Sequence, residues 1–227
     1  MNETLKKELT ELLISLGVGD VGFGKDCELD GLNNLISIVV PLSKAVVDEI
    51  DSAPTHTYFH HYRTLNAFID NALLRAGRFL EEKGHTYIPI PASQSVNLNG
   101  LDYSGRYSHK KAARLCGLGT IGKNSLFIHK TFGPAVRLGT ILTDCEFGET
   151  TPQQDGCLNC NACVKACPAM AIKGCEWYEG IARSEIFDPK ACSDYMKKAF
   201  SHIGRGAVCG ICIKECVKAH KTEVTEK

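Results

Sequence analysis

The sequence predicts an α+β fold for its first 150 residues, followed by a smaller cysteine-rich region. Helical and strand patterns in the first region do not alternate strictly, which favours an α+β sheet over a doubly wound one. Nine of the 12 cysteines lie between residues 151 and 220, after a polar stretch at 148–156 that is typical of a connection. We therefore expect two domains, residues 1–150 and 151–227.

The elements of the first region are predicted from the period of their apolar residues. The N-terminal segment and the long central segment keep their apolar side chains to one helical face, and Gly84 ends the second of these helices. Short β-branched runs predict strands. The predicted elements are helices at 1–17, 56–83 and 108–115, and strands at 35–40, 86–90, 125–129 and 135–143. We expect the last two strands to pair with each other around Gly133 and Pro134.

The composition is that of an ordinary globular protein, with 44% hydrophobic and 23% charged residues. The formal net charge is zero, so there is no general basic field that would attract nucleic acid or an anionic membrane. No apolar stretch reaches the roughly 18 residues of a membrane-spanning helix, and the N-terminus lacks the apolar core of a signal peptide. We expect a cytoplasmic protein without a membrane partner, whose cysteines serve metal or redox chemistry rather than disulfides.

One cysteine motif has the spacing of bacterial two-cluster ferredoxins, and it consists of Cys157-x2-Cys160-x2-Cys163-x3-Cys167-Pro168. Close spacing lets three thiolates of one loop reach three corners of an iron–sulfur cube. We expect the fourth cysteine to open a helix that leads to a second cube. Zinc is the alternative because C-x2-C pairs also bind zinc, but this spacing before a proline suits a cube better.

A second motif, Cys209-x2-Cys212-x3-Cys216, supplies three more ligands. The residue three positions before Cys209 is Gly206, so the first ligand is missing locally, and Cys192 is the candidate replacement. The fourth cysteine of each run serves the other cluster. The predicted [4Fe–4S] ligands are Cys157, Cys160, Cys163 and Cys216 for one cluster, and Cys167, Cys192, Cys209 and Cys212 for the other.

Two neighbouring clusters form a path for single electrons, and such a path needs an end point that we expect in the first 150 residues. The remaining cysteines are expected to be thiols rather than ligands. Among them Cys175 is the one most easily confused with a ligand, because it lies between the two motifs.

A glycine-rich segment contains the pattern G-x-G-x-x-G at Gly117, Gly119 and Gly122. The dinucleotide-binding form of this pattern requires a strand, then the loop, then a helix. Here the predicted order is a helix, the loop and a strand. The position of Lys123 does not match the P-loop spacing either, so neither nucleotide-binding motif is predicted.

Residues 108–128, which include this segment, resemble the corresponding stretch of epoxyqueuosine reductases, and residues 133–144 fit as well. The cysteine order also resembles that family, with a full ferredoxin run, an isolated cysteine after Asp188 and then Cys-Gly-x-Cys-x3-Cys. The resemblance covers most of residues 85–220 and extends, more remotely, to reductive dehalogenases.

The resemblance implies a nitroreductase-like α+β domain that binds cobalamin, followed by a ferredoxin-like domain whose two clusters reduce the cobalt. The corrinoid would carry out the difficult step while the protein orients it. Glycines would allow the backbone to approach the flat corrinoid closely, although a plain structural turn is the alternative. The implied cofactor-binding residues are Ser108, His109, Gly117, Gly119, Gly122, Lys123 and Asn124.

Two departures from the family concern the proton donor and the substrate. The family carries its acid in an Asp-Thr/Ser-Gly/Ala-Pro context, whereas residues 101–107 contain no proline and align Tyr103 with the acid. The candidate donors are Tyr103, Asp102 and Tyr107, since a tyrosine also serves in reductive dehalogenases. The family continues into a helical-repeat segment that helps to bind tRNA, while this sequence ends at Lys227, so we do not expect a tRNA substrate.

The expected function is that of a cobalamin-dependent iron–sulfur reductase acting on a small molecule or a modified base. Its electrons would come from an external low-potential donor of the ferredoxin or flavodoxin type. Two alternatives remain. One is an FMN-dependent reductase on the same scaffold, and the other is a non-catalytic electron-transfer protein that reduces a separate corrinoid protein.

Overall fold

The structure is a computed structural model that describes residues 2–225 except 30, 97–102, 153–156 and 158–159, with the side chains of the last helix described up to His220. The chain forms two compact units, each built from several segments. The first comprises residues 1–41, 64–120 and 137–155, and the second comprises 42–63, 121–136 and 156–227. The domain boundary at residue 150 stays a prediction, since these units interleave along the chain.

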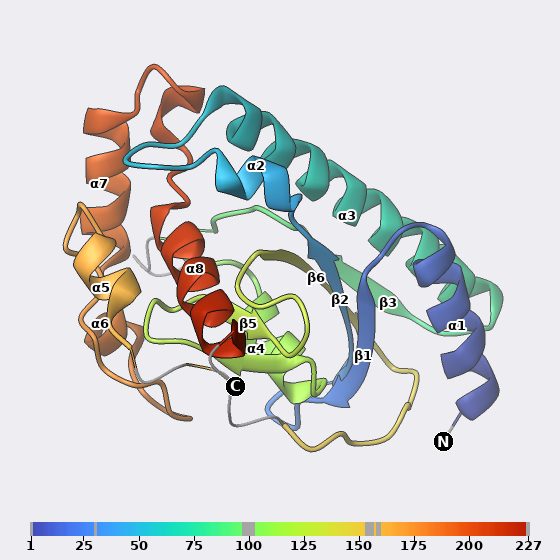
Figure 1. The fold of residues 1–227 in the computed structure, drawn as a ribbon. Coiled ribbons are helices and arrows are strands. Elements are labelled where there is room, and N and C mark those ends of the chain that lie inside the picture. Colours follow the sequence, from blue (N-terminus) through green and yellow to red (C-terminus); the bar gives the residue numbers. More distant parts are fainter. Residues whose placement is uncertain (1, 30, 97–102, 153–156, 158–159, 226–227) are drawn as a thin grey trace. The chain divides into compact units, whose positions relative to one another are not determined.

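The first unit is built on a four-stranded sheet in the order β1-β2-β6-β3 (Figure 1). The strands are β1 (Asp20–Lys25), β2 (Asn34–Pro41), β3 (Tyr87–Ile90) and β6 (Val136–Thr143). β1 is antiparallel to β2, with Asp20 opposite Val39, and β3 is antiparallel to β6, with Tyr87 opposite Thr143. The predicted central strand is confirmed as β2, where every residue but the last is buried.

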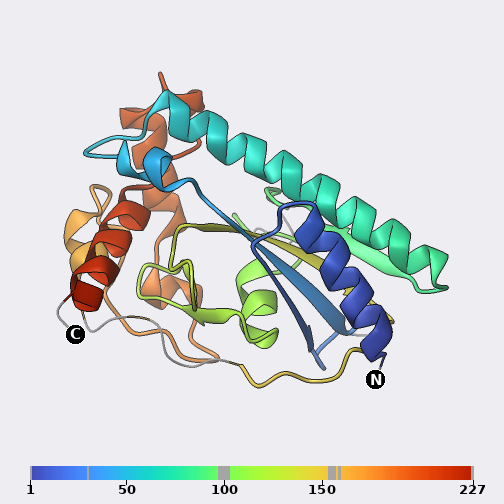
Figure 2. The ribbon, with the colours of Figure 1, turned by 45° about the vertical axis from the view of Figure 1, so that its right-hand side comes forward.

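Helices cover both faces of this sheet (Figure 2). They are α1 (Glu3–Ser15), the part of α3 (His56–Glu82) that follows residue 63, and α4 (His109–Leu115). α1 and α3 place apolar side chains at helical spacing into the core, and these are Leu5, Leu9, Leu13, Ile69, Leu73 and Leu80. All three helices lie where their periodicity predicts them, and with the sheet they confirm the α+β class.

Strand β1 was not predicted from the sequence, because Gly22 and Gly24 weaken its strand pattern. Phe23 points into the core with α1 and α3, while its neighbours Gly22 and Gly24 point to the other face. A Cβ atom at Gly22 would lie 2.6 Å from the carbonyl oxygen of Cys116, and one at Gly24 would lie 2.7 Å from that of Leu115. The glycines are therefore what allows the end of α4 to lie against β1.

The predicted pairing of residues 125–129 with 135–143 is wrong. β5 (Phe127–His129) pairs instead with β4 (Gly119–Ile121), and β6 lies between β2 and β3. The intervening turn explains this, because Gly122 N–H donates to the carbonyl oxygen of Leu126 at 2.9 Å and Ser125 N–H donates to that of Gly122 at 2.8 Å. The helix–strand–turn–strand order confirms that the glycine pattern lacks a dinucleotide-binding context.

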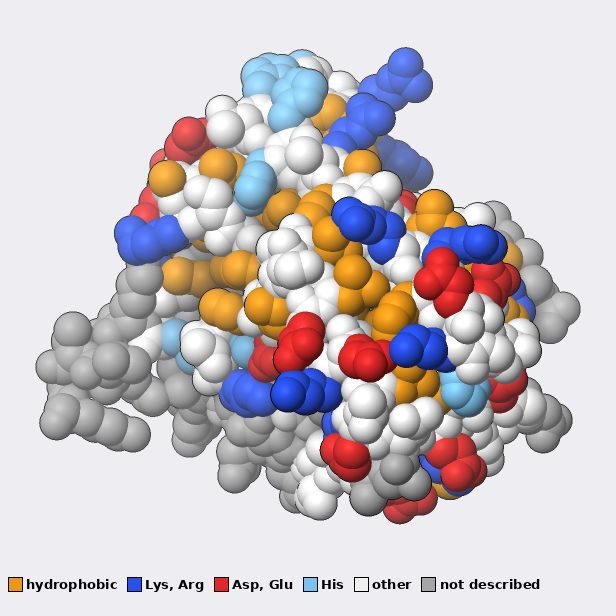
Figure 3. All heavy atoms as spheres, turned by 90° about the vertical axis from the view of Figure 1, so that its right-hand side faces the viewer, with side chains coloured by type: hydrophobic (Ala, Val, Ile, Leu, Met, Phe, Trp, Pro, Cys, Tyr) orange, Lys and Arg blue, Asp and Glu red, His pale blue; other side chains and the backbone are white. Residues whose placement is uncertain are grey.

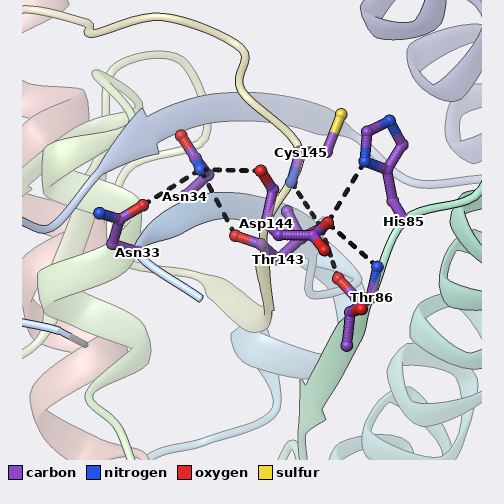
Figure 4. A network of polar contacts seen from close by, with 7 residues as sticks. All are labelled: Asn33, Asn34, His85, Thr86, Thr143, Asp144 and Cys145. Carbon is purple, nitrogen blue, oxygen red and sulfur yellow. Dashed lines mark hydrogen bonds and ion pairs between the residues drawn. The ribbon is translucent and has the colours of Figure 1, made fainter. Parts of the chain in front are cut away.

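Polar contacts join the ends of three strands in the first unit (Figure 4). Asp144, just after β6, accepts a hydrogen bond from Thr86 N–H at 3.0 Å and lies 3.2 Å from Nδ1 of His85. The hydroxyl of Thr143 donates to the carbonyl oxygen of Thr86 at 2.7 Å. Asn34 Nδ2 lies 3.5 Å from the carbonyl oxygens of Thr143 and Asp144. The contacts fix β2, β3 and β6 at this edge.

The second unit consists of helices, the turn after β4 with strand β5, and the start of α3. The helices are α2 (Lys44–Asp48), α5 (Ala162–Ala166), α6 (Arg183–Ile186), α7 (Pro189–Ala199), the 3-10 helix η1 (Gly204–Gly206) and α8 (Ile211–Thr225). α5 packs against α8. Lys214 of α8 donates from Nζ to the carbonyl oxygen of Asp48 at 2.8 Å, which ties α8 to α2.

Cys167 does not open a helix, as the sequence suggested, but ends α5 with an extended backbone (ψ 107°). The following residue is Pro168, which disfavours the helical conformation of the residue before it. The next well-capped helix is α7, where Asp188 accepts a hydrogen bond from Ala191 N–H at 2.9 Å and Pro189 occupies the first turn.

Figure 3 shows the face that lies at the right-hand side of Figure 1, where α1 is found. Charged side chains are interspersed among hydrophobic ones on this face. The large apolar residues of these helices with high exposure are Ile14 (46%) and Leu74 (51%). Apolar side chains that are exposed singly are usual on globular proteins. Across the described residues, no helix combines the length and the apolarity that crossing a bilayer requires.

Candidate iron–sulfur and redox site

A first group of cysteines gathers in the second unit where α5 packs against α8. Cys163 of α5 and Cys216 of α8 are buried. Burial raises the pKa of Cys163, and the neighbouring Cys157 and Cys160 raise it further. Burial also raises the pKa of Cys216 to about 12, with contributions from Cys163, Cys157 and Cys160. The fold thus brings Cys216 to three cysteines that lie more than 50 residues earlier.

A second group forms around α7 and the start of α8. Burial raises the pKa of Cys192 to about 11, and Cys209 and Cys167 contribute to the rise. Cys212 is likewise shifted upward by burial and then by Cys209, Cys192 and Cys167, so its pKa lies well above that of a free thiol. Cys192, which sequence reasoning proposed as the displaced ligand, therefore lies with the other three.

The chemistry of these two donor sets fits a pair of cationic clusters. Thiols that raise one another's pKa resist ionising together, whereas metal binding requires thiolates and supplies the compensating positive charge. Cys163 also contributes to the raised pKa of Cys212, so the two groups are neighbours. The ligand assignment itself stays a prediction.

Single-ion sites follow a different geometry. Within the described residues, no three or more His, Cys, Asp or Glu side chains converge closely enough to hold one metal ion. A cluster distributes its cysteines over separate irons, so its ligands stand farther apart than those of one ion.

The remaining cysteines lie elsewhere, and all 12 are free thiols. Cys116 and Cys145 are buried in the first unit, where the thiol of Cys116 faces the carbonyl oxygen of Leu35 at 3.8 Å. Cys27 and Cys175 are exposed.

The turn after β4 lies beside the first cysteine group. A Cβ atom at Gly122 would lie 3.5 Å from Sγ of Cys157, so the backbone passes close to this ligand candidate. Asn124 is 3% exposed, and its side-chain amide acts to lower the pKa of Cys216 against the larger effect of burial. Lys123 is also buried, with Nζ 3.6 Å from Oε1 of Glu176. Three of the predicted cofactor-binding residues are therefore neighbours of the cysteine-rich segment.

Two other predicted cofactor-binding residues hold the start of α4 in the first unit. The side chain of Ser108 caps α4 by accepting a hydrogen bond from Lys111 N–H at 3.3 Å. The ring of His109 contacts the hydroxyl of Thr140 at 2.8 Å and the carbonyl oxygen of Pro91 at 3.1 Å. Burial lowers the pKa of His109, which favours its neutral form. Each residue has a structural task within the protein.

Gly117 has a structural reason to be glycine. Its φ is +70°, and a Cβ atom would lie 2.6 Å from Cγ2 of Thr150. This supports the alternative of a structural turn at Gly117. Gly119 begins β4 and is buried. A role of either glycine toward a corrinoid stays a prediction.

Among the predicted proton donors, Asp102 lies outside the described residues. Tyr103 adopts a left-handed backbone with φ 63°. Tyr107 donates a hydrogen bond from its hydroxyl to Oδ2 of Asp26 at 2.6 Å, and Nζ of Lys111 lies 2.8 Å from the same oxygen. Sequence reasoning missed Asp26 and Lys111 because no local spacing links residues so far apart.

Burial and the neighbouring carboxylate of Asp26 keep the Tyr107 hydroxyl protonated. Burial and the Asp26 carboxylate raise the pKa of Tyr107 far above that of a free phenol. Burial opposes ionisation of Asp26, but hydrogen bonds from Lys111 and Tyr107 prevail and hold its pKa below the ordinary value. The phenol proton is therefore present at neutral pH, between a carboxylate and the helix α4.

The fold defines the class to which this protein is similar. It superimposes on a selenomethionine-labelled epoxyqueuosine reductase with a TM-score of 0.64, covering 95% of this chain and 66% of that one at 18% identity. It superimposes on a reductive dehalogenase, described with a mechanism for B12-dependent dehalogenation, with a TM-score of 0.73, covering 92% of this chain and 30% of that one at 15% identity. The class that these likenesses define is therefore one of fold, shared with both of these solved structures.

Sequence comparison points more particularly to the first of these groups. The epoxyqueuosine reductase of Listeria monocytogenes is 36% identical over 101 residues, which cover 44% of this chain. The protein therefore has an epoxyqueuosine reductase-like fold and has epoxyqueuosine reductases among its homologues, as the resemblance predicted. The matched part spans only 24% of the Listeria relative. No family model matches the chain.

Proposed function

We propose that this protein is an iron–sulfur reductase that holds two [4Fe–4S] clusters and uses a bound corrinoid, cobalamin, to reduce its substrate. The observation that carries the proposal is the grouping of the buried thiols. Burial, Cys209 and Cys167 raise the pKa of Cys192, and Cys192 in turn contributes to the raised pKa of Cys212. Cys163, Cys157 and Cys160 of the ferredoxin run contribute to the raised pKa of Cys216, and crossed ligation of two clusters requires this proximity.

The clusters would carry single electrons from an external low-potential donor of the ferredoxin or flavodoxin type. Support comes from the proximity of the two groups, since Cys163 of one affects Cys212 of the other. The protein would hold the thiolates in a partly buried setting, which is one of the factors that set cluster potentials.

The corrinoid part of the proposal draws on the resemblance to epoxyqueuosine reductases and on the fold shared with a B12-dependent dehalogenase. When bound, cobalamin would supply a cobalt centre able to deliver electrons to a substrate. The chain's own part would be to hold a proton, and Tyr107 is the best-supported donor because Asp26 and Lys111 fix its hydroxyl. Tyr103 and Asp102 remain candidates.

Anaerobic reconstitution tests the proposal in two separate steps. Iron and sulfide should give about eight iron atoms per chain, four for each cluster. Added cobalamin should then comigrate with the protein and show a cobalt spectrum that changes on reduction. Full iron without corrinoid binding would overturn the corrinoid part, and a yellow protein carrying FMN would favour the flavin enzyme.

The substrate is proposed as a small molecule or a modified base rather than intact tRNA, because the formal net charge is zero. The reduced holoprotein should therefore show no salt-sensitive binding of tRNA. A holoprotein that turns over no small molecule but reduces a separate corrinoid protein would favour the electron-transfer alternative.

A further inference from the structure

Asn124 carries a buried amide nitrogen that has no hydrogen-bond partner among the described residues. Its Nδ2 atom is fully buried, and the whole residue is 3% exposed. Burying an amide donor without a partner costs about 1–3 kcal/mol in proteins. Such a group is unusual in a native fold and indicates an acceptor that the free thiols do not provide and that a bound ligand would complete.

The other end of this amide is fixed. Oδ1 of Asn124 accepts a hydrogen bond from Leu126 N–H at 3.1 Å, which is part of the turn between β4 and β5. Because the amide group is planar and its Oδ1 is held by Leu126 N–H, the turn also restricts the direction of Nδ2. The orientation of the amide is therefore imposed by the fold and does not depend on a ligand.

The side chain of Asn124 lies beside the first cysteine group. The amide of Asn124 acts on the thiol of Cys216, and the same turn passes Cys157 at Gly122, where a Cβ atom would lie 3.5 Å from Sγ. Two of the four cysteines of this group thus border on one turn. Both the turn and the cysteines belong to the second compact unit.

We propose that Asn124 is a positioning residue for the first cluster, whose Nδ2–H group donates a hydrogen bond to the Cys216 sulfur and thereby raises the reduction potential of that cluster. The inference rests on the proposed function, because it assumes a cluster on Cys157, Cys160, Cys163 and Cys216. A donor to a cluster sulfur stabilises the reduced form, which carries more negative charge. The second cluster, on the other four cysteines, would keep its own potential.

Asn124→Asp and Asn124→Ser separate the donor from the turn. Both retain an oxygen that can accept from Leu126 N–H, and both lack Nδ2–H. The matched control is Asn161→Ser, which removes an exposed amide at the N-cap of α5, between Cys160 and Cys163. The second cluster provides an internal reference in each variant.

The readout is an anaerobic redox titration of the reconstituted holoprotein followed by electron paramagnetic resonance. In both Asn124 variants we expect the reduction equilibrium of one cluster to fall about tenfold, a shift of about 59 mV for one electron. Asn161→Ser and the second cluster should not shift. Electron–nuclear double resonance should also lose one exchangeable proton coupling that the wild type shows in H2O but not in D2O.

The possible outcomes distinguish failure of the role of Asn124 from failure of the proposed iron–sulfur function. Wild-type protein that assembles no clusters would contradict the proposed function. Variants with full iron, unchanged potentials and an unchanged proton coupling would overturn the role of Asn124. Selective loss of the first cluster's iron in both variants would also overturn it. Asn124 would then be needed to keep the turn in place, and not as a hydrogen-bond donor that tunes the potential.

Discussion

The hydroxyl of Tyr107 donates a hydrogen bond to Oδ2 of Asp26 at 2.6 Å, joining the segment before α4 to the end of β1. Asp26 is 4% exposed, and its second partner is Lys111 of α4, whose Nζ lies 2.8 Å from the same oxygen. A carboxylate shared by a phenol and an ammonium group is held by more than one contact, so its removal has consequences that can be measured.

Asp26→Asn should lower the free energy of unfolding at neutral pH by about 1–3 kcal/mol, because the Tyr107 hydroxyl and Lys111 lose the carboxylate that they contact. The pKa of Asp26 is lowered in the folded protein, so its contribution is present above pH of about 4 and is lost as the pH falls through the folded value. The difference between wild type and variant in chemical denaturation should therefore shrink below about pH 4.

Glu28→Gln is the matched control for Asp26. Glu28 also pairs with Lys111, at 2.5 Å, but its side chain is 81% exposed. Exposed pairs contribute about 0–1 kcal/mol, so this variant should remain close to wild type. Equal losses for the two variants would show that burial of Asp26 contributes nothing.

His109→Gln should remove a pH-dependent component of stability. The pKa of His109 is lowered by burial, so the neutral ring stabilises the fold above about pH 6.5, and this stabilisation is lost as the pH falls through the lower folded value. Wild type should thus lose up to about 1.4 kcal/mol per pH unit over part of the range from pH 6.5 downward, compared with the variant. The exposed His56 provides the control in His56→Gln, which should leave the wild-type profile unchanged.

Cys192→Ser should damage one cluster selectively. Reconstituted protein should fall from about eight to about four iron atoms per chain, with one paramagnetic species retained. Cys175→Ser, an exchange at an exposed thiol, should leave both clusters intact. Equal loss of iron in the two variants would refute the assignment of Cys192 as a ligand.

Gly24→Ala should destabilise the first unit by about 1–3 kcal/mol, the usual cost of overpacking. The added Cβ atom would meet backbone atoms of Leu115, with the carbonyl oxygen at 2.7 Å, and backbone cannot rotate away as a side chain can. Gly105→Ala is the control, since its nearest neighbours would lie at 3.5 Å. A thermal melt that ranks the two variants in the opposite order would contradict the close approach of α4 to β1.

Long periodic elements could be predicted from the sequence. α1 and α3 follow from leucines and other apolar residues at helical spacing, and β2 follows from an unbroken buried run. β1 could not be predicted, because Gly22 and Gly24 are required by the close approach of α4 and are disfavoured by strand propensity. The partner of β5 was predicted wrongly, since strand pairing depends on which strands share a sheet.

The sequence by itself determined the motifs on which the proposed chemistry rests: a ferredoxin-type cysteine run, a second run with a displaced ligand candidate, and the resemblance to epoxyqueuosine reductases. Ligand spacing within one loop is local, so it can be read along the chain. Only the tertiary structure decided which other distant groups meet, such as Tyr107 with Asp26 and the turn of Asn124 with the cysteines. These contacts depend on packing between segments far apart in the chain, which residue patterns do not specify.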